Sequence, residues 1–231
     1  FLCSFGSLFA GGPSFAFCDY SQGKVFIQEN GEIVWEHKAP DSNDIWVLPN
    51  KNILFTAGKE VLEVSRKNDT IFHYTSESNI FACQRLKNGN TFIGECDNGR
   101  LLEVSPDGSI VKDVSILPFG VKTGGHAFMR NARCLDNGHY LVAHYGGKSV
   151  VEYDENGKAV WNIPVPGGAH SVIRLPSGNT LVAVTDKDNN PGVFEYDMAG
   201  NIVWSLTNKD LPGTLKFAGG MHYLSDGRLF L

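Results

Sequence analysis

Two short patterns of apolar and polar residues alternate along the chain. Each consists of two apolar or β-branched stretches on either side of a turn rich in Asn, Asp, Gly or Pro, which is the signature of a β-hairpin. Copies of the first pattern stand at 47–55, 85–93, 134–142, 174–182 and 223–231. Copies of the second, which contain an acidic residue and often end in Trp, stand at 28–35, 63–74, 103–114, 152–161 and 195–204. The chain is therefore expected to be a series of β-hairpins.

The spacing of the two patterns indicates how the hairpins combine. Asn88-Gly89 and Asn137-Gly138 are dipeptides that supply the positive φ of tight hairpin turns. Two hairpins recur in units of about 40 residues, so each unit holds four strands, as a β-propeller blade does. The fourth unit, for example, predicts strands at 131–135, 140–145, 149–154 and 159–164. Tryptophans share one position in three units and are expected to pack between blades; they are Trp35, Trp161 and Trp204.

The number of copies sets the expected size of the ring. Four units are complete and two are partial, which predicts an all-β propeller of six or seven four-stranded antiparallel blades over residues 15–231. Either the two partial ends combine into one split blade or a longer chain has been cut, and the end of the sequence inside a new inner hairpin at Leu231 favours truncation. Residues 1–14 form an apolar run that ends in small residues. They are expected to be the remnant of a signal peptide, implying export to the periplasm or the cell exterior, or else the first strand.

Composition excludes several classes of protein. The 20 basic and 25 acidic side chains leave a net charge of −5, so no electrostatic footprint for nucleic acid exists. No apolar stretch is long enough for a transmembrane helix. The five cysteines form no C-x-x-C pair, which argues against a zinc site. Cys83 and Cys96 flank one predicted hairpin and are candidates for a disulfide in an exported protein, with buried free thiols as the alternative.

Candidate functional residues lie where one blade leads into the next. Three such segments end in similar form: Gly124-Gly125-His126, Gly168-Ala169-His170 and Gly220-Met221-His222. Each places a histidine near the start of an innermost strand, at one mouth of the central channel, where propeller loops usually carry function. The ligand-binding residues predicted there are Asp44, Trp46, His126, Arg130, Asn131, His170 and His222.

Three interpretations of these histidines stand beside one another. Converging imidazoles could bind a transition metal. One of His126 and His170 could act as nucleophile or general base, with Arg130 holding an oxyanion. Each histidine could instead cap its loop by a hydrogen bond to the backbone. Nucleotide, esterase and zinc-protease motifs are absent, and the loop at 185–192 lacks the glutamate of an EF-hand, so we predict no metal, and the sequence leaves any cofactor unknown.

Two family resemblances add to this interpretation. The alternation of Leu-Pro-Asn-type hairpins with Glu-Tyr-Asp-type hairpins resembles the propeller repeat of quinone-dependent dehydrogenases and their non-catalytic relatives, and this implies a quinoprotein-type propeller. The segment 42–55 is similar to the blade motif of bacterial arylsulfotransferases, with Asn43 and Lys51 in place of that motif's His and Gly. By this second resemblance His170 or His126 would accept a sulfuryl group and Arg130 would clamp the anion.

The expected function is binding rather than catalysis. We expect a small molecule, glycan or protein to bind at the channel face. The sequence shows the propeller scaffold clearly, whereas it shows no complete set of catalytic residues. The first alternative is a transferase or hydrolase centred on His126, His170 and Arg130. The second is a carbohydrate-binding module, which exposed aromatic side chains such as Trp46 or Phe119 would support.

Overall fold

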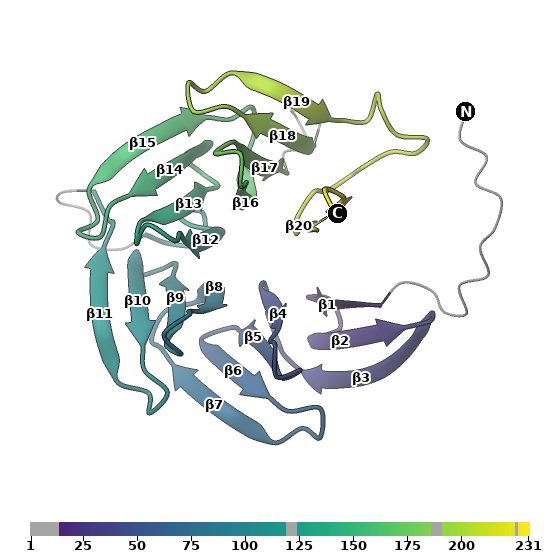
Figure 1. Ribbon diagram of the computed structural model, residues 1–231, viewed down its shortest axis with the longest axis vertical. Coiled ribbons are helices and arrows are strands. Elements are labelled where there is room, and N and C mark those ends of the chain that lie inside the picture. The colour runs from purple at the N-terminus through teal and green to yellow at the C-terminus, as the bar shows by residue number, and fades with distance from the viewer. Residues whose placement is uncertain (1–13, 119–123, 186–190, 225) are drawn as a thin grey trace.

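The computed structural model describes residues 14–118, 124–185, 191–224 and 226–231. The predicted signal-peptide remnant lies outside them except for Ser14. The described residues form β-sheets arranged around a common centre (Figure 1). No helix in these ranges is long and apolar enough to cross a membrane.

Each sheet is antiparallel, and its strands follow chain order. Blade 1 holds β1 (Phe15–Asp19), β2 (Lys24–Glu29) and β3 (Glu32–Lys38). Blade 2 holds β4 (Ile45–Val47), β5 (Ile53–Ala57), β6 (Glu60–Val64) and β7 (Thr70–Thr75). Blade 3 holds β8 (Ile80–Arg85), β9 (Thr91–Glu95), β10 (Arg100–Val104) and β11 (Ile110–Ser115). Blade 4 holds β12 (Asn131–Cys134), β13 (Tyr140–His144), β14 (Ser149–Tyr153) and β15 (Ala159–Pro164). Blade 5 holds β16 (Ala169–Arg174), β17 (Thr180–Val184), β18 (Gly192–Tyr196) and β19 (Ile202–Leu206).

The prediction of six or seven blades is wrong, because the described residues form five blades of three or four strands. The last copy of the first pattern builds a two-stranded hairpin in the described residues, β20 (His222–Tyr223) and β21 (Leu229–Phe230). Blade 1 has three strands in the described residues instead of four. The partial unit at the C-terminal end of the described residues was thus counted as a further blade. The hairpin packs on blade 5 through Tyr223 and Leu229, and Phe230 lies 5.3 Å from the Phe15 ring of blade 1.

The strands β4, β8, β12 and β16 lie nearest the centre of the ring, and the last strand of each blade lies at its rim (Figure 1). Second strands such as β5, β9, β13 and β17 are buried along their whole length. These strands are mostly apolar in sequence, as expected of strands covered by blades on both faces, and Glu95, a buried polar side chain of β9, is hydrogen-bonded. The segments that enter β12 and β16 therefore meet on one face at the channel.

The turns of the first pattern use Gly for positive φ and Asn for its side chain. Gly89 and Gly138 have φ of 90° and 84°, whereas Asn88 and Asn137 do not adopt positive φ. The Asn88 side chain instead accepts a hydrogen bond from the Asn90 N–H at 3.0 Å. In blade 2 the non-glycine residue Lys51 takes the same turn position at φ 70°.

Tryptophans pack between blades at two of the three predicted positions. Trp35 is buried among residues of blade 2. Trp161 donates its indole N–H to the Met198 carbonyl of blade 5 at 2.9 Å. The third, Trp204, is 44% exposed, so the interblade interpretation does not hold there.

The cysteines of the described residues are free thiols, which removes the proposed bridge between Cys83 and Cys96. The two side chains lie on opposite faces of blade 3. Cys83 belongs to the apolar cluster shared with blade 2, and Cys96 to the cluster shared with blade 4. The sheet itself therefore separates them.

Candidate functional site

Three predicted residues meet where blades 4 and 5 border the channel. Arg130 immediately precedes β12, His170 is part of β16, and His126 lies in the segment that leads into blade 4. Arg130 Nη1 lies 3.0 Å from His126 Nε2, and Arg130 Nη2 lies 3.1 Å from His170 Nε2. We call these three side chains the mouth cluster. Two innermost strands, 40 residues apart in sequence, position it.

The contacts of His170 define its tautomer. Its Nδ1 lies 3.1 Å from the Gly219 carbonyl, which only accepts, so Nδ1 carries the proton. Its Nε2 faces the guanidinium of Arg130, which only donates, so Nε2 is the acceptor. His170 is therefore a neutral imidazole. Burial, and next the positive charge of Arg130, lower the pKa of His170 to about 4.

Aromatic rings surround the mouth cluster. The Arg130 guanidinium carbon lies 4.5 Å from the centre of the buried Phe81 ring, a cation–π contact. Tyr145 and Phe217 approach His170 edge-on, at 6.3 and 5.0 Å between ring centres. Phe217 is 60% exposed, so an apolar side chain that faces solvent borders the mouth cluster.

The segment carrying His126 is anchored to the turn between β9 and β10. The Gly124 N–H donates to the Asp97 carbonyl at 2.7 Å, and the Cys96 thiol donates to the Gly125 carbonyl at 2.9 Å. Burial raises the pKa of Cys96 to about 11, so its sulfur remains a protonated donor at neutral pH. This turn therefore determines where the segment with His126 begins.

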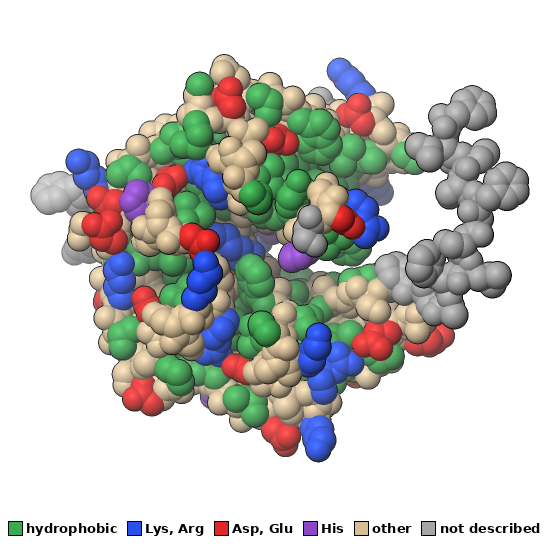
Figure 2. All heavy atoms as spheres, in the orientation of Figure 1, with side chains coloured by type: hydrophobic (Ala, Val, Ile, Leu, Met, Phe, Trp, Pro, Cys, Tyr) green, Lys and Arg blue, Asp and Glu red, His purple; other side chains and the backbone are tan. Residues whose placement is uncertain are grey.

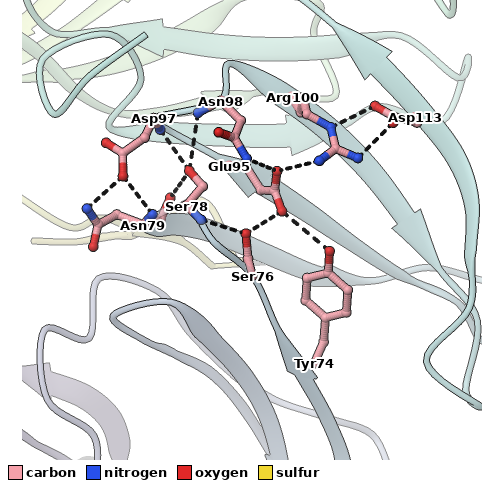
Figure 3. A network of polar contacts seen from close by, with 9 residues as sticks. All are labelled: Tyr74, Ser76, Ser78, Asn79, Glu95, Asp97, Asn98, Arg100 and Asp113. Carbon is pink, nitrogen blue, oxygen red and sulfur yellow. Dashed lines mark hydrogen bonds and ion pairs between the residues drawn. The ribbon is translucent and has the colours of Figure 1, made fainter. Parts of the chain in front are cut away.

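A polar network holds that turn in place (Figure 3). The Asp97 carboxylate accepts from the Asn79 backbone and side chain at 2.9 and 2.8 Å. Glu95, 1% exposed, accepts from Ser76 at 2.5 Å and from Arg100 at 3.2 Å. Since a buried carboxylate is stable only when paired and hydrogen-bonded, this network fixes the turn to which the segment with His126 is anchored.

Asp44 and Trp46, also predicted as ligand-binding residues, belong to a different contact. The Asp44 carboxylate forms two hydrogen bonds with Arg133, at 2.6 and 3.0 Å, and accepts the Cys83 N–H at 3.0 Å. The Arg133 guanidinium stacks on the Trp46 ring at 5.0 Å. Asp44 belongs to blade 2 and Arg133 to blade 4, so this ion pair joins two non-adjacent blades. Both partners are mostly buried, which gives the pair a structural role.

Asn131 and His222 do not join the mouth cluster. Asn131 is buried, and its side-chain oxygen accepts the Val172 N–H of blade 5 at 3.4 Å, a long contact between adjacent innermost strands. His222 lies in β20, is exposed and makes no contact with His126 or His170 in the described ranges. The structure thus brings together two of the three histidines.

The contacts bear on the interpretations of the histidines. No group of three or more His, Cys, Asp or Glu side chains in the described part of the chain could hold a metal ion. Between His126 and His170 stands the cation Arg130, which would repel one. Loop capping does hold for His170 through Gly219. The candidate calcium loop at 186–190 and Phe119 lie outside the described residues.

Sequence reasoning missed several neighbours of the predicted residues. Arg133 is two residues beyond Asn131, and alternation along a strand puts both side chains on one face of the sheet. The sequence could therefore have predicted that Arg133 lies near the channel. Phe81, Tyr145 and Phe217 carry no motif, and their positions depend on how the blades pack.

A groove of about 880 Å³ lies elsewhere, between blades 4 and 5 at the rim, with Pro164, Phe194, Tyr196 and Lys209 in its lining. A smaller one, of about 260 Å³, is lined by Val151 and Tyr153, which occupy the positions in blade 4 that Phe194 and Tyr196 occupy in blade 5. We interpret both as spaces left where repeated blades diverge outward.

The face of the ring drawn in Figure 2 is also hollowed near its centre.

The fold and the central cluster define a β-propeller with a polar group of side chains at its channel. Among solved structures, a protein of unknown function from Bacteroides caccae is similar with a TM-score of 0.81 and 23% identity, over 93% of this chain and 80% of that one. A streptogramin B lyase matches with a TM-score of 0.62 and 15% identity, over 94% and 78%. A catalytically inactive histidine-to-alanine variant of virginiamycin B lyase from Staphylococcus aureus, with quinupristin, matches with a TM-score of 0.60 and 13% identity, over 95% and 83%. No family model and no curated protein matches this chain. At these identities the likeness extends to the fold alone.

Proposed function

We propose that this protein is a ligand-binding β-propeller whose site is the mouth cluster. The observation that carries the proposal is the convergence of His126, Arg130 and His170 on one another at 3.0 and 3.1 Å. These side chains come from blades 4 and 5 and from the segment that leads into blade 4, and that segment is anchored by hydrogen bonds to a polar network. Binding sites favour such rigidly placed polar groups beside exposed apolar surface.

A small molecule fits this site better than a large partner. The three polar side chains of the mouth cluster lie within hydrogen-bonding distance of one another, and the exposed Phe217 ring borders His170. Arg133, the other arginine of this part of blade 4, is paired with Asp44. Arg130 is therefore the arginine that can donate to a ligand. The mouth cluster therefore offers too few exposed groups to contact the broad surface of a protein partner.

The test is a thermal-shift screen of a small-molecule collection. Binding to the folded state raises the melting temperature, and we expect hits whose effect disappears in Phe217→Ala and Arg130→Gln. The matched control is Lys209→Ala in the rim groove, which should keep those hits. Hits that depend on Lys209 and ignore Phe217 and Arg130 would place the ligand in the groove and refute the proposal.

A second candidate is acid–base or group-transfer catalysis at the same cluster. The neutral His170 with a defined tautomer, next to a cation, is an arrangement that such chemistry uses. Two of the similar structures are lyases, and the resemblance to arylsulfotransferases points to sulfuryl transfer. Release of 4-nitrophenol from its sulfate ester, abolished in His170→Ala and retained in His222→Ala, would establish cleavage of the ester, with the sulfuryl group passing to water or to an added phenol acceptor. The absence of turnover on aryl sulfates would contradict sulfuryl transfer.

A further inference from the structure

Arg130 differs from the other arginines of the chain. All seven lie in the described ranges, and six form ion pairs with carboxylates there. For Arg130 those ranges offer no carboxylate partner; its two outer nitrogens contact only the imidazoles of His126 and His170. Burial lowers the pKa of Arg130, which is the mark of a cation partly removed from water. A half-buried cation without a counter-ion is costly and leaves a place for an anion.

We propose that the ligand carries an oxyanion on an apolar body, and that this oxyanion replaces His126 and His170 on the Arg130 guanidinium. The inference rests on the proposed function and names the chemical class of its ligand. It extends to carboxylates, sulfates and phosphates, since all present two oxygens to a guanidinium.

The geometry makes the exchange favourable. Nη1 and Nη2 are the pair of donors that a two-oxygen anion engages side by side, and each now donates to one neutral ring. A charge-assisted hydrogen bond is about twice as strong as one between neutral groups. The anion therefore gains more from Arg130 than the two imidazoles lose.

The surroundings identify the apolar body. Phe217 stands edge-on to His170 and is 60% exposed. The Phe81 ring lies against the Arg130 guanidinium, at 4.5 Å from its carbon. An aromatic or other apolar group bound to Arg130 would cover the exposed Phe217 ring.

Displacement of the imidazoles couples binding to proton uptake. Once freed from Arg130, His170 Nε2 lies next to an anion and can take up a proton, which the cation now opposes. The other titratable groups that act on Arg130 are Cys96, Tyr20 and Tyr145. Burial raises the pKa of Cys96 to about 11, and the hydrogen bond to Asp41 raises the pKa of Tyr20, so both keep their protons near pH 7. The imidazole of His170 is therefore the group expected to change charge, and affinity for the anion should rise as pH falls from about 7.5 to about 5.5.

Calorimetric titration of the whole chain tests the inference. The probes are benzoate, phenyl phosphate and phenyl sulfate, with benzamide as the uncharged match, each in two buffers of different ionisation enthalpy near pH 6.5. We expect at least one oxyanion to bind at least tenfold more tightly than benzamide, with uptake of at least about half a proton. The oxyanion that binds best identifies the ligand class.

Variants separate the inference from a change in folding. Arg130→Gln should lose tenfold or more in oxyanion affinity and Arg130→Lys should retain part of it, because Lys keeps the charge without the fork. His170→Asn should reduce proton uptake. The control is Arg228→Gln, an exposed arginine paired with Asp226, which should change nothing. Melting curves of each variant confirm that it folds.

The failures of the two proposals are distinguishable. Benzamide bound as tightly as the oxyanions, anion binding unaffected by Arg130→Gln, or binding without proton uptake would each overturn the oxyanion inference and leave a ligand site at the mouth cluster intact. If neither the oxyanions nor any compound of the thermal-shift screen depends on Arg130 or Phe217, the proposed function fails as well.

Discussion

The three Gly-x-His segments differ at the scale of single residues. A side chain at Gly124 would meet the Cys96 carbonyl oxygen at 2.5 Å, and one at Gly168 would overlap the Tyr145 ring. At Gly220 nothing lies within 4 Å. The first two glycines are required by the close approach of their neighbours, and these are also the glycines that lead into His126 and His170.

Alanine substitutions at the three glycines should therefore differ in their effect on stability. We expect Gly124→Ala and Gly168→Ala to lower the free energy of unfolding by about 1–3 kcal/mol, because an inserted methyl group must displace packed atoms. Gly220→Ala should leave it unchanged. Urea denaturation of the three variants measures this, and equal effects at Gly124, Gly168 and Gly220 would show that the segments have the same surroundings.

The stability of the fold should depend on pH through His170. Its pKa is about 4 in the folded protein and about 6.5 in the unfolded chain, so between these values the unfolded chain binds the proton and the folded protein does not. Stability should therefore be fully present above about pH 6.5 and fall toward pH 4, by about 1.4 kcal/mol per pH unit at most from this residue. In His170→Asn this part of the slope should disappear. An identical pH profile in wild type and variant would contradict the neutral, buried state of His170.

At the scale of strands, the acidic residue of the second pattern ties two of the blades to the next one. Glu63 accepts from Arg85 of blade 3, and Glu152 accepts from Arg174 of blade 5, both at 2.6 Å. Among the described residues, Glu103 of blade 3 accepts from Asn88 and Asn90 of its own blade, because blade 4 has Cys134 where the other two have arginine. The repeated units thus place glutamate at the same position with an arginine partner in two cases and without one in a third.

This difference predicts unequal costs for the same substitution. Glu152→Ala leaves the mostly buried Arg174 without a carboxylate and should cost about 3–5 kcal/mol of stability. Glu103→Ala removes two hydrogen bonds from neutral amides to a partly exposed carboxylate, strands no buried charge, and should cost about 1.5 kcal/mol. Chemical denaturation with both variants measures the difference. Comparable losses would mean that the arginine contributes nothing to the interblade contact.

The strands were readable from sequence because their signals are local. Strands predicted at 131–135, 140–145, 149–154 and 159–164 are observed as β12, β13, β14 and β15 with the bounds shifted by at most one residue. Turn residues and apolar stretches determine a hairpin whatever lies elsewhere in the chain. The number of blades was wrong because it depends on how incomplete units at the chain ends pair, and residues 28–35 or 223–231 carry no local signal for that.

For the whole molecule, the ring brings together side chains far apart in sequence. Equivalent positions in repeated units predicted that His126 and His170 would meet near Arg130, and they do. Symmetry could not predict that His222 would stay apart, because β20 belongs to a two-stranded hairpin instead of a full blade. Nor could it predict the Asp44–Arg133 pair, whose partners come from blades separated by a third.

The most direct test of the account is a crystallographic fragment screen of this chain. We expect ligands to bind at the channel, on Arg130, and not in the rim groove beside Phe194 and Tyr196. Fragments with an oxyanion on an aromatic ring should therefore bind at Arg130, with His126 and His170 moved off its nitrogens. Fragments that fill the rim groove and leave Arg130 bound to both imidazoles would contradict this expectation.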